Sequence, residues 1–293
     1  MLLGEDIRIQ NFRCLRDVKF KLGAFTVIVG PNASGKTALA DALTGLDRPD
    51  GNDSHMRTTA PHFWHGKGDS RNKSIFGGRR VKYTFAPASL RSTVVSNSVW
   101  DLDPSGTLLA NLFDTLSRDQ QQRFVADFTK LVPVYQDVTA RAVQGKHHLE
   151  FQDRWNDAVW YQPQQISDGS ILAAAFVALG YQREVPDLAV FEDPDHGLHP
   201  YLQRHVVELF RKLSRGEIGP KPIQIVCTTH SKALLDILEP DEVLFISRDR
   251  KTGESVISPA PTDDPNWTKL YDKFQGSLGD IWMTGTMGGV PSI

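Results

Sequence analysis

The segment from Gly30 to Thr37 constrains the fold of this chain more than any other part of its sequence. It reads GPNASGKT, it follows the apolar run Phe25 to Val29, and it precedes TALADALTGL, whose leucines keep helical spacing. A GxxxxGK[ST] loop between a strand and a helix is typical of a P-loop, in which backbone N–H groups and the helix N-terminus hold phosphate oxygens. The sequence therefore predicts an α/β, P-loop NTPase fold.

Each residue type in this loop has an expected task. The glycines let the backbone turn inward, Lys36 neutralises β- and γ-phosphate charge, and the Thr37 hydroxyl ligates magnesium. We expect ATP and Mg²⁺ as ligands, because a glycine turn without a ligand does not explain the flanking strand and helix. The residues expected to contact the nucleotide are Gly30, Pro31, Asn32, Ala33, Ser34, Gly35, Lys36, Thr37 and Ala38.

Composition is typical of a folded globular protein, with 40% hydrophobic and 23% charged residues. A formal net charge of -2 gives no field that would by itself concentrate the chain on a polyanion, so any nucleic-acid contact would be local. Cys14 and Cys227 fit no CxxC spacing, and no apolar stretch reaches the ~18 residues that a membrane helix needs. We expect a soluble, cytoplasmic protein with reduced, buried cysteines.

Strand-like and helix-like segments alternate along the chain, which predicts a mostly parallel central sheet. Two alternating runs before Phe25 predict an N-terminal antiparallel pair, and 48–78 is expected to be a long surface loop. Two helices are expected within 107–132, broken near Ser117. Further strands are expected at 81–85, 138–142, 148–151, 188–191, 223–228 and 242–247, and further helices at 167–181, 203–213 and after His230.

Carboxylates and an imidazole follow two of the buried strands. Leu188 to Phe191 leads into Glu192 and Asp193, and the strand from Ile223 leads into His230. Because carboxyl ends of parallel strands meet at one sheet edge, we expect Glu192 near the metal and Asp193 near the water that attacks the γ-phosphate. His230 could hydrogen-bond the γ-phosphate. An acidic helix cap and a structural histidine are the alternative readings.

Together these residues resemble the ABC ATPase superfamily, in particular its RecF, SMC and OLD-like branch of standalone AAA-family ATPases. The opening DIRIQNFRCLRDVKFKL looks like the hairpin of that branch, Ile166 to Ser170 (ISDGS) like its signature, GLHP at Gly197 to Pro200 like its D-loop, and CTTHS like its switch-histidine segment. The resemblance covers roughly 5–250, and 48–160 carries little beyond general layout. It implies one ABC-type ATPase domain, 1–293. The N-terminal hairpin and the P-loop would lie at 5–47, and a helical insertion at 48–160. The signature, the Walker B strand and the switch region would lie at 161–250, followed by a hairpin, one helix and a tail at 251–293.

The resemblance also implies a mechanism. Ser167 and Gly169 of one subunit would cap the γ-phosphate held by Lys36 and Thr37 of another, so ATP would join two copies into a head-to-tail homodimer or a higher oligomer. Glu192 and Thr37 would hold Mg²⁺, and Asp193, Glu192, His230 and Lys36 would carry catalysis. A Ser-Asp-Gly-Ser segment before an Ala-rich helix is also an ordinary N-cap.

Asp193 departs from the family pattern, where glutamate is usual. A carboxylate withdrawn by roughly 1 Å can cost ~100-fold in rate, so slow hydrolysis is expected. No glutamine can be assigned to the Q-loop, and neither a long coiled coil nor a nuclease domain follows. Asp195 is a weaker alternative base.

Three functions compete on this sequence. The first is an ATP-driven switch that controls a separately encoded effector, such as a nuclease, in DNA repair or antiviral defence. The second is the nucleotide-binding subunit of an ABC transporter, which fits the SDGS segment less well. The third is a small-molecule P-loop kinase, which leaves SDGS and GLHP without a role.

Smaller features leave alternatives open. The basic cluster from Arg248 to Lys251 is either solvated surface or a phosphate contact, and no metal other than Mg²⁺ is expected at His62–His65 or at His147 and His148. The tail around Trp282, Met283 and Met287 is either a poorly ordered terminus or an apolar docking segment.

Overall fold

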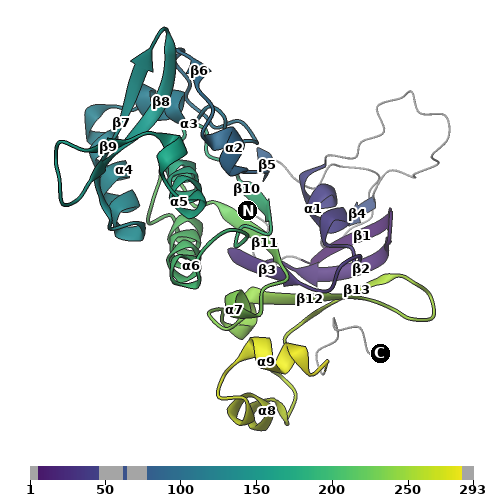
Figure 1. Ribbon diagram of the computed structural model, residues 1–293. Helices are drawn as coiled ribbons and strands as arrows, with labels where there is room; N and C mark the ends of the chain where they lie inside the picture. Colours follow the sequence, from purple (N-terminus) through teal and green to yellow (C-terminus); the bar gives the residue numbers. More distant parts are fainter. Residues whose placement is uncertain (1–5, 46–61, 65–77, 286–293) are drawn as a thin grey trace. The chain divides into compact units, whose positions relative to one another are not determined.

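The computed structural model describes residues 6–45, 62–64 and 78–285 (Figure 1). The chain forms two compact units, between which it passes several times. The first comprises Met1–Lys82, Asp187–Asp195 and Gln224–Ile293, and the second comprises Tyr83–Pro186 and His196–Ile223. Each unit is described by itself below.

A six-stranded sheet forms the centre of the first unit, in the order β13-β12-β3-β11-β10-β5. The strands are β3 (Phe25–Val29), β5 (Arg80–Tyr83), β10 (Leu188–Glu192), β11 (Gln224–Thr229), β12 (Val243–Arg248) and β13 (Ser255–Pro259). β10, β11, β3 and β12 run parallel, and β13 returns antiparallel to β12. β3 and β11 are buried along their whole length, as expected for parallel strands covered on both faces. This confirms the predicted α/β fold with a mostly parallel sheet.

A smaller antiparallel sheet confirms the predicted N-terminal β-subdomain. β1 (Asp6–Phe12) lies between β2 (Leu15–Lys21) and β4 (His62–Trp64), with Ile9 opposite Val18. Its apolar side chains share one core with those of α1 (Lys36–Thr44). β4 lies within the expected loop at 48–78, so that segment is not wholly irregular; most of the loop, and Leu46, lie outside the described residues.

The second unit combines helices with an antiparallel sheet. Its longer helices are α3 (Leu109–Thr115), α4 (Arg118–Leu131), α5 (Asp168–Ala178) and α6 (Pro200–Arg215), and its sheet contains β6 (Val94–Val95), β8 (Lys146–Asp153), β7 (Tyr135–Val143) and β9 (Trp160–Tyr161). A short helix, α2 (Pro87–Leu90), precedes β6. The predicted break near Ser117 is confirmed, because Ser117 and Gln120 cap α4 reciprocally. The rings of Phe124, Phe128 and Phe151 are fully buried here.

The C-terminal segment differs from the prediction of one helix and an open tail. Two helices, α8 (Trp267–Lys273) and α9 (Leu278–Met283), follow the β12–β13 hairpin, and α9 packs against α7 (Lys232–Leu235). Ser277 caps α9, and Trp282 is only 7% exposed, so packing rather than composition decides this segment. The tail beyond Gly285, with Met287, lies outside the described residues. Within the described ranges, no helix has the length and apolar character needed to span a membrane.

Candidate nucleotide site

The P-loop backbone leaves β3 and enters α1 through two glycines that no other residue could replace without displacement. A Cβ on Gly30 would lie 2.1 Å from the carbonyl oxygen of Ile246 on the neighbouring strand β12. Gly35 has a φ of +110°, and a Cβ there would lie 2.6 Å from the Ser255 Oγ. The glycines of the sequence pattern therefore reflect close packing around the loop, and their small size lets the backbone turn as a phosphate-binding loop requires.

Lys36 lies at the start of α1 with its ammonium folded back over the loop. Its Nζ donates hydrogen bonds to the carbonyl oxygens of Gly30 at 2.8 Å and Pro31 at 2.9 Å. Burial lowers the pKa of Lys36, and the nearby charges of Asp193 and Glu192 oppose that shift. A desolvated cation held by exchangeable carbonyl contacts is suited to receive phosphate oxygens.

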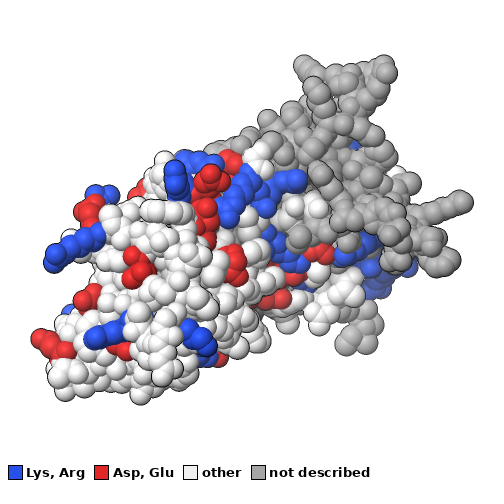
Figure 2. Space-filling view, turned by 90° about the horizontal axis from the view of Figure 1, so that it is seen from above, with Lys and Arg blue, Asp and Glu red and all other residues white. Residues whose placement is uncertain are grey.

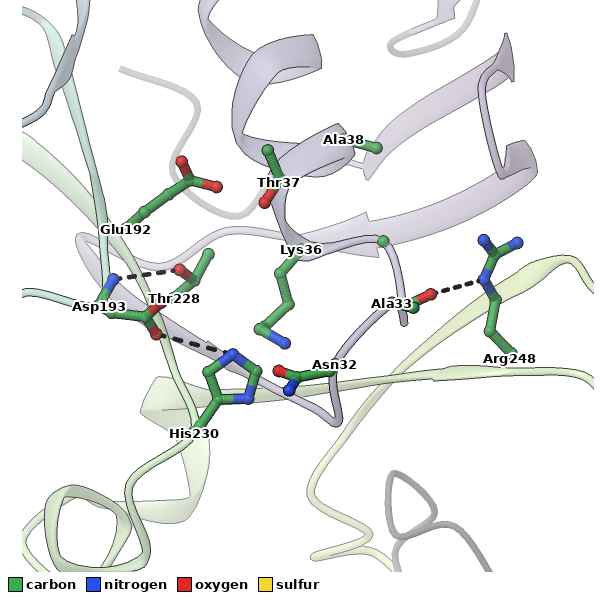
Figure 3. A pocket seen from close by; sticks show the side chains of 11 residues that line it. Asn32, Ala33, Lys36, Thr37, Ala38, Glu192, Asp193, Thr228, His230 and Arg248 are labelled. Carbon is green, nitrogen blue, oxygen red and sulfur yellow. Dashed lines mark hydrogen bonds and ion pairs between the residues drawn. The ribbon is translucent and has the colours of Figure 1, made fainter.

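The ends of β10 and β11 bring the predicted polar residues together. The Asp193 N–H donates to the Thr228 carbonyl oxygen at 3.0 Å, which fixes the end of β10 against β11. His230 follows β11, and its Nε2 lies 3.9 Å from the Asp193 Oδ1 (Figure 3). Asp193 has a φ of +45°, in the left-handed region that Asp tolerates better than most residues. Asp195, the alternative base, instead accepts a hydrogen bond from Thr229.

These groups line one open pocket of about 280 Å³. Figure 3 shows Lys36, Asn32 and His230 pointing toward the same space, with Glu192 and Thr37 on another side of it. The lining residues are Asn32, Ala33, Gly35, Lys36, Thr37, Ala38, Glu192, Asp193, Thr228, His230 and Arg248. Thus the structure brings together the P-loop and three predicted strand-end residues, all within the first unit.

The donor set on the Glu192 side fits a magnesium ion. Thr37 and Glu192 supply the hydroxyl and carboxylate oxygens that a hard cation prefers, and the Thr37 side chain is exposed. The Asp193 Oδ1 is buried and accepts no hydrogen bond in the described part of the chain, so it can accept one from a ligand or water. A bound Mg²⁺ would neutralise phosphate charge at this position.

Lys82 is a residue of this site that the sequence analysis missed. It lies on β5, and its Nζ contacts the Asp41 Oδ1 at 2.6 Å and the Glu192 Oε2 at 2.8 Å. Arg13 contacts the second Asp41 oxygen at 2.8 Å. Burial lowers the pKa of Lys82, but hydrogen bonds to the two carboxylates outweigh it and leave that pKa raised. The Walker B carboxylate is therefore already paired with a cation from a neighbouring strand.

Arg248 belongs to the basic cluster that the sequence left open as solvated surface or a phosphate contact, and it lines the pocket. Its Nε donates to the Ala33 carbonyl oxygen at 2.9 Å (Figure 3). Its Nη1 donates to the Gly253 carbonyl in the β12–β13 turn. Ala33 has a φ of +61°. Arg248 thus connects a strained P-loop residue to the hairpin, which favours the P-loop conformation observed.

The signature segment lies in the second unit. Ser167 is exposed and caps α5, with its Oγ accepting from the Ser170 N–H at 3.2 Å. Gly169 is buried, and a Cβ there would lie 3.0 Å from Leu202 at the start of α6. Arg91 donates to the Ile166 carbonyl and pairs with Asp168 at 2.6 Å. This N-terminus of α5 is therefore rigidly held with its cap facing solvent.

The histidine pairs have other partners. His147 lies within hydrogen-bond distance of Asn111 at 2.8 Å and of Ser96 at 2.9 Å, and His148 pairs with Glu150. In the described part of the chain, no three His, Cys, Asp or Glu side chains gather as a metal cluster would. His65 and the side chain of His62 lie outside what the structure describes.

Comparison with protein families gives two matches. Residues 5–78 match the family described as "AAA ATPase domain", and residues 96–236 match "AAA domain, putative AbiEii toxin, Type IV TA system". The first match contains the P-loop, and the second contains the signature, the Glu192–Asp193 strand end and His230.

Curated relatives match to different extents. An OLD nuclease of Thermus scotoductus is 49% identical over 37 residues, which cover 13% of this chain and 7% of that protein. The energy-coupling factor transporter ATP-binding protein EcfA2 of Ligilactobacillus salivarius is 22% identical over 88% of this chain and 76% of that protein. Among solved structures, an SMC head domain from Thermotoga maritima matches 87% of this chain and 98% of its own length, with a TM-score of 0.54 and 15% identity.

The fold, the pocket and these matches define the class of protein. The chain is an ABC-type ATPase of the RecF, SMC and OLD-like branch. Its match to the OLD nuclease spans a small part of that protein, and its likeness to the SMC head is one of fold.

Proposed function

We propose that two copies of this chain close head to tail around two ATP molecules, and that this clamp controls a separately encoded effector. The observation that carries the proposal is the exposed Ser167 cap on α5 in one unit, while an open phosphate pocket belongs to the other unit. A helix N-terminus with free N–H groups favours an anionic phosphate. In the dimer, Ser167 and Gly169 of one copy would cap the γ-phosphate bound by its partner.

Hydrolysis would be carried by residues already in the pocket. Lys36 would exchange its two carbonyl contacts for phosphate oxygens, and Thr37 and Glu192 would hold the magnesium ion. Asp193 would accept a proton from the attacking water, and His230 would donate a hydrogen bond to the γ-phosphate. Because Asp193 is one methylene shorter than glutamate, we propose that hydrolysis is slow and that the ATP-bound dimer is long-lived.

The dimer is tested with an Asp193→Asn protein, which should bind ATP and hydrolyse it poorly. Light scattering should show a doubled mass when ATP and magnesium are added. A Ser167→Arg change in that background should abolish the doubling and leave ATP binding by the monomer intact. The matched control is Ser117→Arg, which places the same bulk at another capped helix of the second unit. If the Asp193→Asn protein binds nucleotide but its mass is unchanged, the proposed dimer is wrong.

We propose that the effector is a nuclease or another DNA-directed protein, in antiviral defence or DNA repair. The short OLD nuclease match supports the proposal. On the face shown in Figure 2, Lys and Arg lie among Asp and Glu, and much of the described surface is uncharged. Since the formal net charge of the chain is also -2, we place DNA contact with the effector. The effector should bind the Asp193→Asn protein in the presence of ATP, and it should not bind the double variant that also carries Ser167→Arg. Equal binding to the single and the double variant would contradict control by the clamp.

A transporter subunit is the second candidate, because the EcfA2 match extends along most of the chain. Expression without any membrane partner separates the two proposals. A switch of the kind proposed should purify stably from the soluble fraction, with both free cysteines, Cys14 and Cys227, reduced as in the cytoplasm. A chain that is stable only when coexpressed with a membrane protein would favour the transporter.

A further inference from the structure

Four charged side chains form a compact network beside the phosphate pocket. Lys82 on β5 bridges Asp41 of α1 and Glu192 of β10, and Arg13 contacts Asp41 from the β1–β2 turn. The side chains of Lys82 and Asp41 are only 10% and 12% exposed, whereas Glu192 is 27% exposed and borders the pocket. The network therefore connects a shielded interior position with the position expected for the metal.

Glu192 is the carboxylate that would hold magnesium, and the Lys82 ammonium lies 2.8 Å from one of its oxygens. A magnesium ion binds carboxylate oxygen at about 2.1 Å and demands nearly ideal geometry. Two cations at such short range from the same carboxylate repel each other, and the low exposure of the site weakens the screening of that repulsion by water. Magnesium binding and the contact between Lys82 and Glu192 therefore oppose each other.

Asp41 offers Lys82 a second position. Its Oδ1 is already 2.6 Å from the Lys82 Nζ, so the ammonium would keep a charged partner if it left Glu192. Arg13 donates to the other oxygen of Asp41, which holds that carboxylate in place. No other large movement is required, because β5 and β10 belong to one sheet.

We propose that Lys82 is an internal counter-cation of Glu192, which competes with magnesium and sets the magnesium concentration at which nucleotide loads. The inference rests on the proposed ATP site and concerns its regulation. Without magnesium, Lys82 neutralises Glu192 and keeps the carboxylate ordered. Loading with Mg²⁺ and nucleotide transfers Lys82 to Asp41 alone. Lys82 is a positioning residue here, since it acts on the nucleotide through Glu192.

The test measures the binding of a fluorescent ADP analogue as a function of free magnesium, so no turnover is involved. Lys82→Met removes the competing charge, and the magnesium concentration for half-maximal binding should fall about tenfold. Lys82→Arg keeps the charge and should behave within twofold of the unchanged protein. The matched control, Arg8→Met, removes a cation of the same unit that pairs with Asp17 and is not part of this network, and it should leave the magnesium dependence unchanged.

The outcomes separate this inference from the proposed function. If the unchanged protein binds no nucleotide at saturating magnesium, the ATP site itself is wrong. If it binds nucleotide but Lys82→Met needs the same or more magnesium, competition by Lys82 is refuted and the ATP site stands. Should Lys82→Met fail to fold by circular dichroism, Lys82→Gln keeps a polar N–H donor without the charge and should shift the magnesium dependence in the same direction.

Discussion

The length of the side chain at position 193 is the most exacting test of the proposed chemistry. Asp193 directly follows β10, its Oδ1 lies 3.9 Å from the His230 Nε2, and that oxygen is buried without a hydrogen bond among the described residues. Asp193→Glu would extend the carboxylate by roughly 1 Å, a displacement that can be worth ~100-fold in rate. We therefore expect kcat for ATP hydrolysis to rise by about 10- to 100-fold.

The backbone makes this gain costly for stability. The φ of +45° at Asp193 lies in the left-handed region, which Asp and Asn tolerate because their short side chains can hydrogen-bond locally. Glutamate there should lose about 1 kcal/mol of folding free energy. In a domain of this size, that loss lowers Tm by about 2 to 4 °C. A faster but less stable enzyme is the expected signature.

Steady-state ATPase kinetics and thermal unfolding check both expectations on one preparation. Asp193→Asn is the matched control, because Asn keeps the left-handed preference and loses the charge. It should lower kcat by at least about 100-fold and leave Tm nearly unchanged. If Asp193→Glu binds ATP with an unchanged Kd yet hydrolyses it no faster, side-chain length does not limit this site.

Two further predictions concern the P-loop, and a third concerns the C-terminal helices. Gly35→Ala places a Cβ 2.6 Å from the Ser255 Oγ at a φ of +110°. The free energy of unfolding should fall by about 2 kcal/mol and the nucleotide affinity by more than about tenfold. Unchanged nucleotide binding by calorimetry would refute a rigid loop. Arg248→Gln removes the hydrogen bond to the Ala33 carbonyl, so the Kd for ADP should rise about fivefold. An unchanged Kd would mean that the P-loop keeps its conformation without Arg248. Gly279→Leu should release α9 from α7, which hydrogen exchange would detect as lost protection in α9, with ADP binding retained.

The sequence predicted the parts of the site that depend on contiguous residues. The strand, the glycine loop and the helix around Lys36 follow from local periodicity and the steric freedom of glycine. The strand ends at Glu192, Asp193 and His230 were also predicted, because parallel strands bring their carboxyl ends to one edge. The structure brings these segments together as expected, while their catalytic roles stay proposals.

Lys82 was missed, and the place of Arg248 in the pocket was not predicted, for a different reason. Each acts on a residue far away in the sequence, and the contact depends on which strands are neighbours. The alternation in Arg80–Tyr83 could have shown that Lys82 shares a face with Arg80, but not that β5 lies beside β10. The helix α9 was missed because six residues form a helix only when packing stabilises them.

Under the proposed function, binding and hydrolysis of ATP would depend on different parts of this site. Phosphate binding would use a loop packed closely against the β12–β13 hairpin, with Gly30 beside the Ile246 carbonyl, Gly35 beside the Ser255 side chain, and the Ala33 carbonyl accepting from Arg248. Hydrolysis would use a short carboxylate at Asp193 and a metal ligand, Glu192, that Lys82 already engages. The short carboxylate would slow turnover without weakening the phosphate loop. The contact between Lys82 and Glu192 would instead set the magnesium concentration needed for loading. We infer that the chain favours retention of ATP over its hydrolysis, so the lifetime of the dimer, rather than the supply of ATP, would set how long the effector stays controlled.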